Sequence, residues 1–345
     1  MRAGACLVAR SVRGIEDLVA AEIGRRGLGE VVATGHREVR FVTSDTAAPG
    51  VTALATADDV FVVGVEVDGI GRARGDLARL ARAVAAADLS APLALRARCG
   101  GPPGGSVDVS ASFLGRRSFS RFDVEDAVGA VLARRLGLRY HSRRSDARPP
   151  EGGLTWRVTV VGDRATVAVR VGARPLHRRT WKVAGVPGTL HPPLAAAMVA
   201  LAGVAAGERV LDPCCGAGTL AIEAALAGAV AMGVDLDAGA LAAAARNGKR
   251  TPVRWARADA AALPVATGSV RRVLLNPPWG RVVEPSGRLA RRPDLLSREI
   301  RRVLEPDGTA VVLIPEGSAA PAGFRVNRRI PVALAGARLV VLVLG

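Results

Sequence analysis

The sequence predicts an α/β protein in which a mostly parallel seven-stranded sheet, closed by an antiparallel hairpin, fills the last half and smaller α+β units precede it. From about residue 191 onward, short apolar strands alternate with helical stretches, which is typical of βαβ units. The first of these strands ends in a glycine-rich turn, and two apolar runs joined by "AGA" close the chain. The length of 345 residues allows two or three domains.

Residues 1–65 have the pattern of a small α+β domain. "ACLVARSVRG" predicts a strand and a turn, "GIEDLVAAEIGRRG" predicts a helix, and "EVVATGHREVRFV" predicts further strands. The apolar face of that helix consists of Ile15, Leu18, Val19 and Ile23. One sheet with one helix on it is therefore expected here.

Residues 66–185 predict a second α+β domain. "GDLARLARAVAAADL" is an amphipathic helix, while "PLALRAR" and "VDVSASF" alternate like strands. "RFDVEDAVGAVLARRLG" predicts a helix with Asp123 as its cap and Gly137 as its stop. "LTWRVTVVGDRATVAVRV" predicts a hairpin with a two-residue "GD" turn. Trp156 alternates with strand residues, so a core position is expected, and Trp181 is left as a candidate for base stacking.

Residues 186–345 contain the parallel sheet. "HPPLAAAMVALAG" predicts the helix that leads into it. The strands, in chain order, are "ERVLD", "VAMGVD", "VRWAR", "VRRVLL" and "TAVVLIP", followed by "FRVNRRIPVAL" and "ARLVVLVL" as the antiparallel hairpin.

The positive charge of the chain is concentrated in one segment. The net charge is +17, and all but two of the basic residues are arginines. Residues 1–133 hold 16 basic and 16 acidic side chains, residues 134–182 hold 13 and 3, and residues 183–345 hold 19 and 12. A uniform compositional bias would not leave the first third neutral, so a local surface for a polyanion is favoured.

Several function classes are disfavoured by what the sequence contains. No apolar run reaches the length of a membrane span, and the start lacks the pattern of a secretory signal, so a cytoplasmic protein without a membrane partner is expected. The four cysteines (Cys6, Cys99, Cys214 and Cys215) give neither a disulfide framework nor zinc spacing, so no metal is expected. His177 and His191 are single histidines in the sequence and receive no catalytic role.

The turn in "RVLDPCCGAGTLAIEAALAG" fits two cofactors. Gly216, Gly218 and Ala221 satisfy G-x-G-x-x-A, and Asp235 lies where the ribose acid of a dinucleotide site is expected. A nicotinamide enzyme is therefore one candidate. Asp212 favours the other, because a carboxylate just before the turn would repel a pyrophosphate but attract an ammonium group.

Three acids at successive strand ends match S-adenosylmethionine. Asp212, Asp235 and Asp259 can meet its ammonium, its ribose diol and its adenine amine, respectively. Asp259 can equally cap a short helix, and Asp237 is expected to be a helix N-cap.

The segment "NPPWG" ends the fourth parallel strand. Two prolines without N–H groups hold the preceding carbonyls rigidly, so Asn276 and the Pro277 carbonyl offer a pair of acceptors to an exocyclic base amine. This grip favours a tetrahedral nitrogen whose lone pair attacks a methyl group in line. Trp279 can stack on the flipped base, with a strand-ending turn and a core tryptophan as the structural alternative. A protein glutamine methyltransferase would use the same motif, but the basic charge disfavours it.

The loop after this motif is also basic. It carries Arg281, Arg288, Arg291 and Arg292, which either close over the substrate and touch phosphate or form a solvated surface.

Together these segments resemble the THUMP-domain RNA methyltransferases, especially the transfer-RNA guanine-N2 enzymes. "DPCCGAGTLAIEAA" is similar to the cofactor loop of that family, and "NPPWGR" to its Asn-Pro-Pro-aromatic-Gly signature, although tyrosine or phenylalanine is more usual there. "VEDAVGAVLARRLG", the hairpin and "VRVGARPLHRRTW" resemble the THUMP half, and "GIEDLVAAEI" resembles its ferredoxin-like N-terminal partner.

The resemblance implies a ferredoxin-like domain at 1–65, a THUMP domain at 66–185 that holds the 3′ end of transfer RNA, and a Rossmann-like methyltransferase domain at 186–345. The implied reaction is methylation of guanosine N2 in tRNA by a monomer that uses S-adenosyl-L-methionine. Three alternatives stay open: adenine-N6 methylation, ribosomal RNA as the substrate, and a non-catalytic RNA-binding protein with a vestigial pocket.

Overall fold

The chain folds into two compact units. The computed structural model describes residues 4–144, 148–280 and 283–345. The N-terminal unit comprises the chain up to Arg10 together with Ala20–Leu176, and the C-terminal unit comprises Ser11–Val19 and His177–Gly345. Trp181 therefore belongs to the C-terminal unit, outside the half in which the sequence interpretation had placed it.

The N-terminal unit is built on one eight-stranded sheet with the order β2-β3-β1-β4-β8-β7-β5-β6. All pairings are antiparallel except those of β5 with β6 and β7. Its strands are β1 (Ala5–Arg10), β2 (Glu30–Gly35), β3 (Glu38–Thr43), β4 (Asp59–Val67), β5 (Ser106–Phe113), β6 (Arg139–His141), β7 (Leu154–Val161) and β8 (Arg164–Arg170). The predicted hairpin is confirmed as β7–β8, with Gly162 and Asp163 in its turn and Trp156 fully buried.

The sheet continues across the expected domain boundary near residue 65. Strand β4 pairs with β1 through residues 59–62 and with β8 through residues 61–67. One strand thus belongs to both of the predicted N-terminal domains, and their backbones share hydrogen bonds. The division into ferredoxin-like and THUMP domains stays a prediction.

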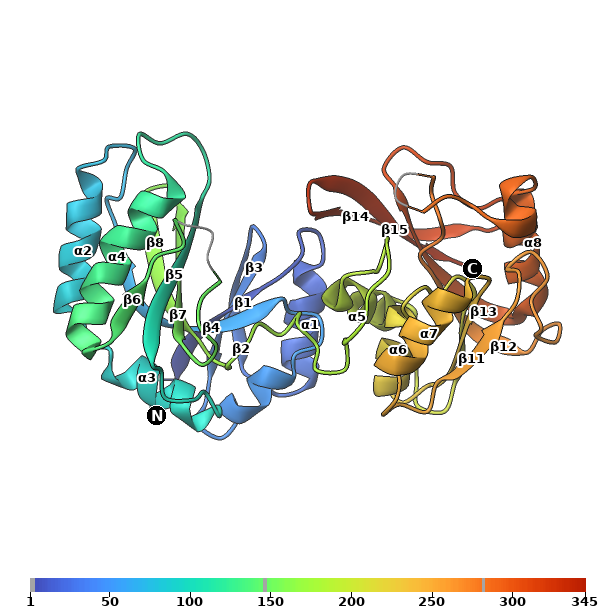
Figure 1. Ribbon diagram of the computed structural model, residues 1–345, viewed down its shortest axis with the longest axis horizontal. Helices are drawn as coiled ribbons and strands as arrows, with labels where there is room; N and C mark the ends of the chain where they lie inside the picture. The colour runs from blue at the N-terminus through green and yellow to red at the C-terminus, as the bar shows by residue number, and fades with distance from the viewer. Residues whose placement is uncertain (1–3, 145–147, 281–282) are drawn as a thin grey trace. The chain divides into compact units, whose positions relative to one another are not determined.

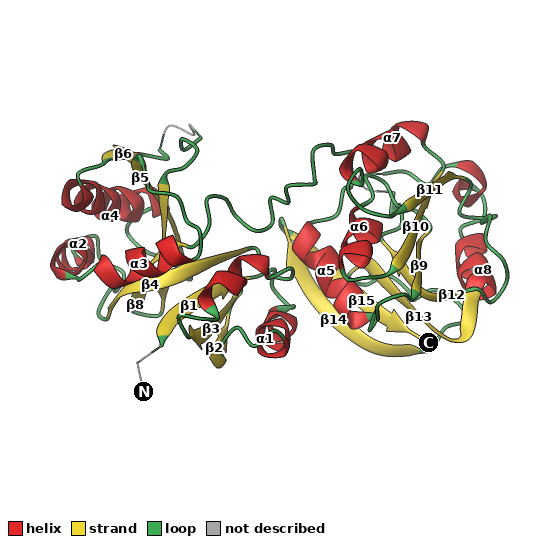
Figure 2. Cartoon of the chain, turned by 90° about the horizontal axis from the view of Figure 1, so that it is seen from below, coloured by secondary structure: helices red, strands yellow, loops and turns green. Residues whose placement is uncertain are grey.

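Helices α2 and α4 lie side by side in this unit (Figures 1 and 2), and α4 contacts β5. The helical segments of this part of the chain are α1 (Glu16–Arg25), η1 (Ala48–Ala53), α2 (Asp76–Ala86), α3 (Ser90–Arg98) and α4 (Arg121–Leu136). The expected apolar face of α1 is confirmed, because Ile15, Val19 and Ile23 are fully buried.

Two local expectations in this unit are wrong. "PLALRAR" was expected to be a strand but lies in α3. Its alternation is short, and Ala, Leu and Arg are strong helix formers, so helix propensity prevails. The cap of α4 is Ser120. Its side chain accepts a hydrogen bond from the Asp123 backbone N–H, and the Asp123 side chain accepts one from the Ser120 backbone N–H, which together form a capping box. Gly137 ends α4 in the left-handed conformation, as expected.

The C-terminal unit contains a seven-stranded sheet with the order β11-β10-β9-β12-β13-β15-β14. The first five strands in this order are parallel, and β15 runs antiparallel between β13 and β14, as the sequence predicts. The strands are β9 (Arg209–Asp212), β10 (Val230–Asp235), β11 (Arg254–Arg257), β12 (Val270–Leu275), β13 (Leu304–Pro315), β14 (Val326–Leu334) and β15 (Ala337–Leu344).

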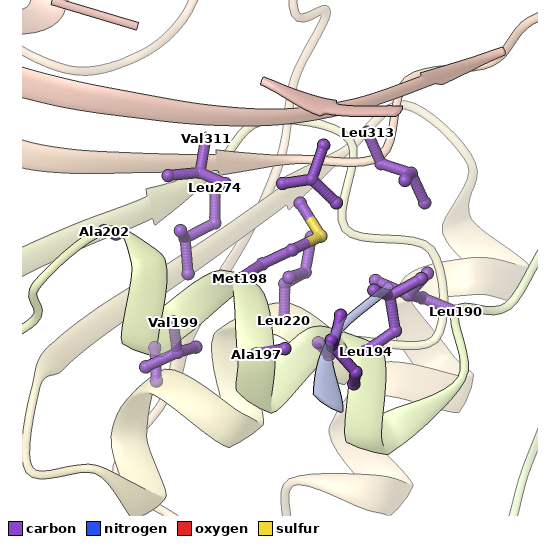
Figure 3. Close-up of a cluster of buried hydrophobic side chains, with 14 of the residues drawn as sticks. Leu190, Leu194, Ala197, Met198, Val199, Ala202, Leu220, Leu274, Val311 and Leu313 are labelled. Carbon is purple, nitrogen blue, oxygen red and sulfur yellow. The ribbon is translucent and has the colours of Figure 1, made fainter. Parts of the chain in front are cut away.

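Helices cover both faces of this sheet. They are α5 (Pro192–Leu201), α6 (Thr219–Leu226), α7 (Ala238–Asn247), η2 (Gly287–Ala290) and α8 (Asp294–Val303). On one face, Leu194 and Met198 of α5 and Leu220 of α6 pack against Leu274 and Val311 of the sheet (Figure 3). On the other face, residues of α8 pack against β12 and β13. This two-sided cover leaves the carboxyl ends of the parallel strands as the edge where a site can form.

Candidate functional site

A cavity of about 770 Å³ lies at the carboxyl ends of the parallel strands in the C-terminal unit. The chain runs outward from β9 to β10 and β11 and then returns to β12 on the other side of β9, so the order switches direction at β9. Ligands of open α/β sheets bind at this switch point. Of the predicted site residues, Asp212, Gly216, Asp235, Asp259, Asn276, Pro277 and Trp279 all line the cavity.

Asp212 is the most deeply buried acid of the cavity. It is the last residue of β9, its exposure is 1%, and it accepts one hydrogen bond from the Cys214 backbone at 3.3 Å. Burial, with a further contribution from the nearby Asp235, raises the pKa of Asp212 well above its usual value. A cationic group bound beside it would offset this cost, which fits the predicted ammonium.

The glycine loop and Asp235 are joined directly. The Gly216 backbone donates to one carboxylate oxygen of Asp235 at 2.8 Å, and the Asp237 backbone donates to the other at 3.0 Å. Gly216 has a φ of +52°, and a Cβ there would meet only the Val186 side chain at 3.7 Å. The loop therefore presents bare backbone to the cavity. Asp237 is the N-cap of α7, as predicted.

Gly218 differs from its expected role as a residue that a ligand approaches. It caps α6 with a φ of +83°, and a Cβ there would come within 2.5 Å of the Trp255 ring and 3.1 Å of Ala244. It is also absent from the cavity lining. The structure thus uses Gly218 for the close packing of α6 and β11, a contact between segments that the local motif does not reveal.

Asp259 lines the cavity and also organises two loops. Its carboxylate accepts hydrogen bonds from the Ala261 backbone and, at the start of η2, from the Arg288 backbone, each at 2.9 Å. Both readings of this residue, ligand contact and local cap, are therefore compatible with its position.

Asn276 follows the last paired residue of β12, Leu275. Its Nδ2 donates a hydrogen bond to the Gly188 carbonyl at 3.2 Å. Because only the amide nitrogen can donate to a carbonyl, this bond leaves the Oδ1 atom of Asn276 as an acceptor, and no described residue donates to it. That is the atom that the predicted amine grip requires.

Trp279 has a position that fits both of its predicted roles, stacking on a base and packing in the core. Its side chain lines the cavity and also packs partly against the core around α5. The indole Nε1 is buried and has no hydrogen-bond partner within the part of the chain that the structure describes.

One wall of the cavity was not foreseen. It consists of the segment Val186–Leu190, which the sequence analysis did not single out as part of a site. Asn247, at the end of α7 and 2% exposed, accepts from the Val183 and Ala184 backbones, both at 2.9 Å. Its amide also donates to the carbonyls of Ala184 at 3.0 Å and Ala217 at 2.9 Å. Asn247 therefore links residues 183–184, directly before this wall, to Ala217 of the glycine loop.

Thr219 is a second residue that the motif did not single out. It is the first residue of α6, its exposure is 3%, and it lines the cavity. Its hydroxyl is buried and unbonded within the described ranges. A buried hydroxyl at a helix N-terminus suits an acceptor such as a ligand carboxylate. The sequence signal was its place directly after the glycine turn.

The loop after Trp279 contributes less basic character than expected. Val283, Glu284, Ser286 and Leu289 line the cavity, whereas none of Arg288, Arg291 and Arg292 does. Arg292 instead pairs with Asp294 at 2.9 Å. Arg281 lies outside the described residues.

The comparisons with known proteins agree with this geometry. Residues 179–329 match the family UPF0020, described as the RMKL-like methyltransferase domain. The tRNA (guanine(6)-N2)-methyltransferase of Thermus thermophilus is 38% identical over 182 residues, which cover 51% of this chain and 52% of that protein. The tRNA (guanine(10)-N2)-dimethyltransferase of Methanothermobacter thermautotrophicus is 35% identical over 33% of each chain.

A solved structure extends the similarity to the whole chain. The crystal structure of TrmN from Thermus thermophilus superposes with a TM-score of 0.77 at 29% identity, covering 98% of both chains. In sequence, the alignments span only about half or a third of the curated relatives.

The C-terminal unit therefore has the fold of a class I methyltransferase domain, and residues 179–329 are similar in sequence to the RMKL-like methyltransferase domain. Within the described residues, no helix is long and apolar enough to cross a membrane.

Proposed function

We propose that this protein transfers a methyl group from S-adenosyl-L-methionine to the exocyclic N2 amine of a guanosine in tRNA. The observation that carries the proposal is the position of Asn276. Its amide is fixed by Gly188 with the Oδ1 atom left free, and it lines the same cavity as the buried Asp212.

The cavity suits the methyl donor. Asp212 supplies a buried carboxylate for an ammonium, and the unbonded hydroxyl of Thr219 at the start of α6 supplies a donor for a carboxylate. We assign Asp235 to a ribose diol, and Asp259 with Ala260 to an adenine edge, because all three line the cavity. When bound, the cofactor supplies an electrophilic methyl group.

The polar groups beyond β12 would hold the acceptor amine. Asn276 Oδ1 and the Pro277 carbonyl each accept one N–H bond, which turns the nitrogen lone pair toward the methyl group. A donor held by Asp212 and Thr219 would supply its methyl group to this nitrogen and would leave as the neutral thioether, and the amine would give up one proton to solvent. Trp279 offers its ring to the base that must be unstacked to reach the cavity.

The choice of tRNA and of guanine N2 rests on the relatives. Both curated proteins are named for guanine-N2 methylation of tRNA. The N-terminal unit, which carries most of the segment with net charge +10, would bind the RNA as ferredoxin-like and THUMP domains. The four free cysteines fit a reducing cytoplasm, and we propose a monomer as the active form.

Nucleoside mass spectrometry tests this proposal. The gene is deleted, and nucleosides from purified tRNA and ribosomal RNA are compared before and after complementation. We expect N2-methylguanosine to disappear from tRNA and to return with the wild-type gene. Loss of N6-methyladenosine, or a change confined to ribosomal RNA, would refute the substrate assignment.

Complementation with Asn276→Ala tests the site itself. We expect a fall in kcat of about a hundredfold or more, because the variant lacks an acceptor that acts on the reacting amine. Calorimetry should show cofactor affinity within about threefold of wild type. Asn327→Ala is a matched control, because Asn327 is exposed and lies on the edge strand β14. Normal turnover of Asn276→Ala would remove Asn276 from the mechanism.

A further inference from the structure

One face of the N-terminal sheet carries an unusual number of charged and hydroxyl side chains. Strand register places them on a common side, because directly paired residues and residues two apart along a strand share a face. We call this set the polar sheet face: Arg10, Glu38, Arg40, Asp59, Asp108, Ser110, Ser112, Thr155, Arg157 and Arg170. The neighbouring Trp156 points to the opposite, fully buried side.

The acids of the polar sheet face are matched by arginines. Arg10 pairs with Glu38 at 2.8 Å, and Arg170 pairs with Asp59 at 2.7 Å. Arg143, from the loop after β6, pairs with Asp108 through its Nε at 3.0 Å. Each of these carboxylates is nearly buried, so each arginine there neutralises a specific charge.

Arg157 is the exception on this face. Within the described residues it has no carboxylate partner, and its hydrogen bonds go to the hydroxyls of Ser112 at 2.6 Å and Ser110 at 3.4 Å. Its Nε is buried and has no acceptor among the described residues. Hydroxyl groups are weak acceptors for a guanidinium, but they can rotate to donate to a third group.

Arg157 lies among other arginines, so the region around it is rich in positive charge. Burial, together with the charges of Arg10, Arg37 and Arg143, lowers the pKa of Arg157 to about 10. The region thus has an excess of positive charge, and an added anion would relieve the repulsion.

We propose that Arg157, Ser110 and Ser112 form a binding site for a phosphate group of the RNA strand. The guanidinium would give charge-assisted hydrogen bonds to the phosphate oxygens, and the two serine hydroxyls would donate further ones. This inference rests on the proposed function for the identity of the nucleic acid, but it assigns a specific anchor in the other unit.

RNA binding of Arg157→Gln tests the site. Fluorescence anisotropy with a labelled tRNA, in a series of salt concentrations, should show about a tenfold weaker affinity and a salt dependence reduced by about one counterion. Arg164→Gln is the matched control: Arg164 is exposed on β8, pairs with Glu66 and Asp68, and carries the same charge. It should weaken binding by less than about threefold.

Two further measurements separate folding and cofactor effects from the phosphate site. Ser112→Ala removes a single hydroxyl and should weaken RNA binding about threefold without changing the circular dichroism spectrum. Cofactor affinity, measured by calorimetry, should be unchanged in Arg157→Gln, because that site lies in the C-terminal unit. If the wild-type protein does not bind the cofactor, the proposed function is wrong. The RNA titration would still test the phosphate site, because it does not depend on cofactor binding.

The proposal fails if Arg157→Gln and Arg164→Gln weaken tRNA binding equally. It also fails if inorganic phosphate, at matched ionic strength, raises the Tm of the wild type but not of Arg157→Gln while tRNA affinity is the same for both. That result would assign the site to a free small anion.

Discussion

The polar sheet face of the N-terminal unit and the cavity of the C-terminal unit treat their acids in opposite ways. On the polar sheet face of the N-terminal unit, Asp59 and Asp108 each have an arginine partner. In the cavity of the C-terminal unit, Asp212, Asp235 and Asp259 receive hydrogen bonds from backbone N–H groups and, among described residues, from no lysine or arginine side chain.

This difference separates structural charge from functional charge. A buried carboxylate with its own arginine is already compensated, so it has little left to offer a ligand. A buried carboxylate without a cation keeps a strong preference for one, and Asp212 is the clearest case. Arg157, in the unit proposed to bind RNA, is the reverse case: a cation with no carboxylate partner in the part of the chain that the structure describes.

The largest effect is expected from breaking a compensated pair. Arg170→Met leaves Asp59 buried without its cation, even though burial already raises the pKa of Asp59 to about 6. We expect the free energy of unfolding at pH 7 to fall by about 3 kcal/mol. Urea denaturation measures it, with Arg164→Met as an exposed control that should change by less than about 0.5 kcal/mol. A fall below about 1 kcal/mol would mean that the pair is not structural.

Neutralising Asp212 should lower cofactor affinity rather than stability. Asp212→Asn keeps the shape of the side chain but loses the attraction for an ammonium, so we expect cofactor affinity to fall about a hundredfold. The stability of the ligand-free protein should not decrease. Asp237→Asn, which preserves an N-cap at the same edge, is the control and should stay within about threefold. Equal affinities for both variants would contradict the assignment of Asp212.

A new negative charge at the buried Asn247 should lower both stability and cofactor affinity. Asn247→Asp replaces two amide donors with a carboxylate that faces the Ala184 and Ala217 carbonyls. We expect a loss of about 2 kcal/mol in unfolding free energy and weaker cofactor binding, because the wall at Val186–Leu190 loosens. Asn327→Asp, at an exposed site, should be nearly neutral. A stable variant with normal cofactor affinity would show that the wall does not depend on Asn247.

The smallest effect is a dependence on pH. The pKa of Asp212 is higher in the folded protein than in the unfolded chain, where it is about 3.9. Between these values the native state holds a proton that the unfolded state has released, so the free energy of unfolding falls as pH rises. The Tm of ligand-free Asp212→Asn, relative to wild type, should therefore increase from pH 4 upward. A difference that is constant with pH would contradict a raised pKa.

The sequence and the structure agree best where a pattern is local. The strands of the parallel sheet, the caps at Asp237 and Gly137, and the "GD" turn all depend on neighbouring residues, and all were predicted. "PLALRAR" was misassigned because five alternating positions cannot outweigh helix propensity. Ser120 was missed as a cap because its role depends on a reciprocal bond with Asp123.

The site shows the same division. Asp212, Asp235, Asp259 and Asn276 could be found because the carboxyl ends of parallel strands meet at one edge, so residues at strand ends are brought together by topology alone. Which atom of the Asn276 amide is engaged depends on the Gly188 carbonyl, and what holds the wall beside it depends on Asn247; both residues are distant along the chain.

By itself, the sequence determined the order of strands and helices around the parallel sheet, the glycine turn, and Asp212, Asp235 and Asp259 at the strand ends, because these follow from hydrophobic period and turn chemistry. Only the tertiary structure decided which charges are compensated. Arg170 pairs with Asp59 from 111 residues away, whereas among the residues that the structure describes Arg157 bonds to two serine hydroxyls and to no carboxylate. Pairing of this kind depends on strand register across the whole sheet, which no local stretch of sequence specifies.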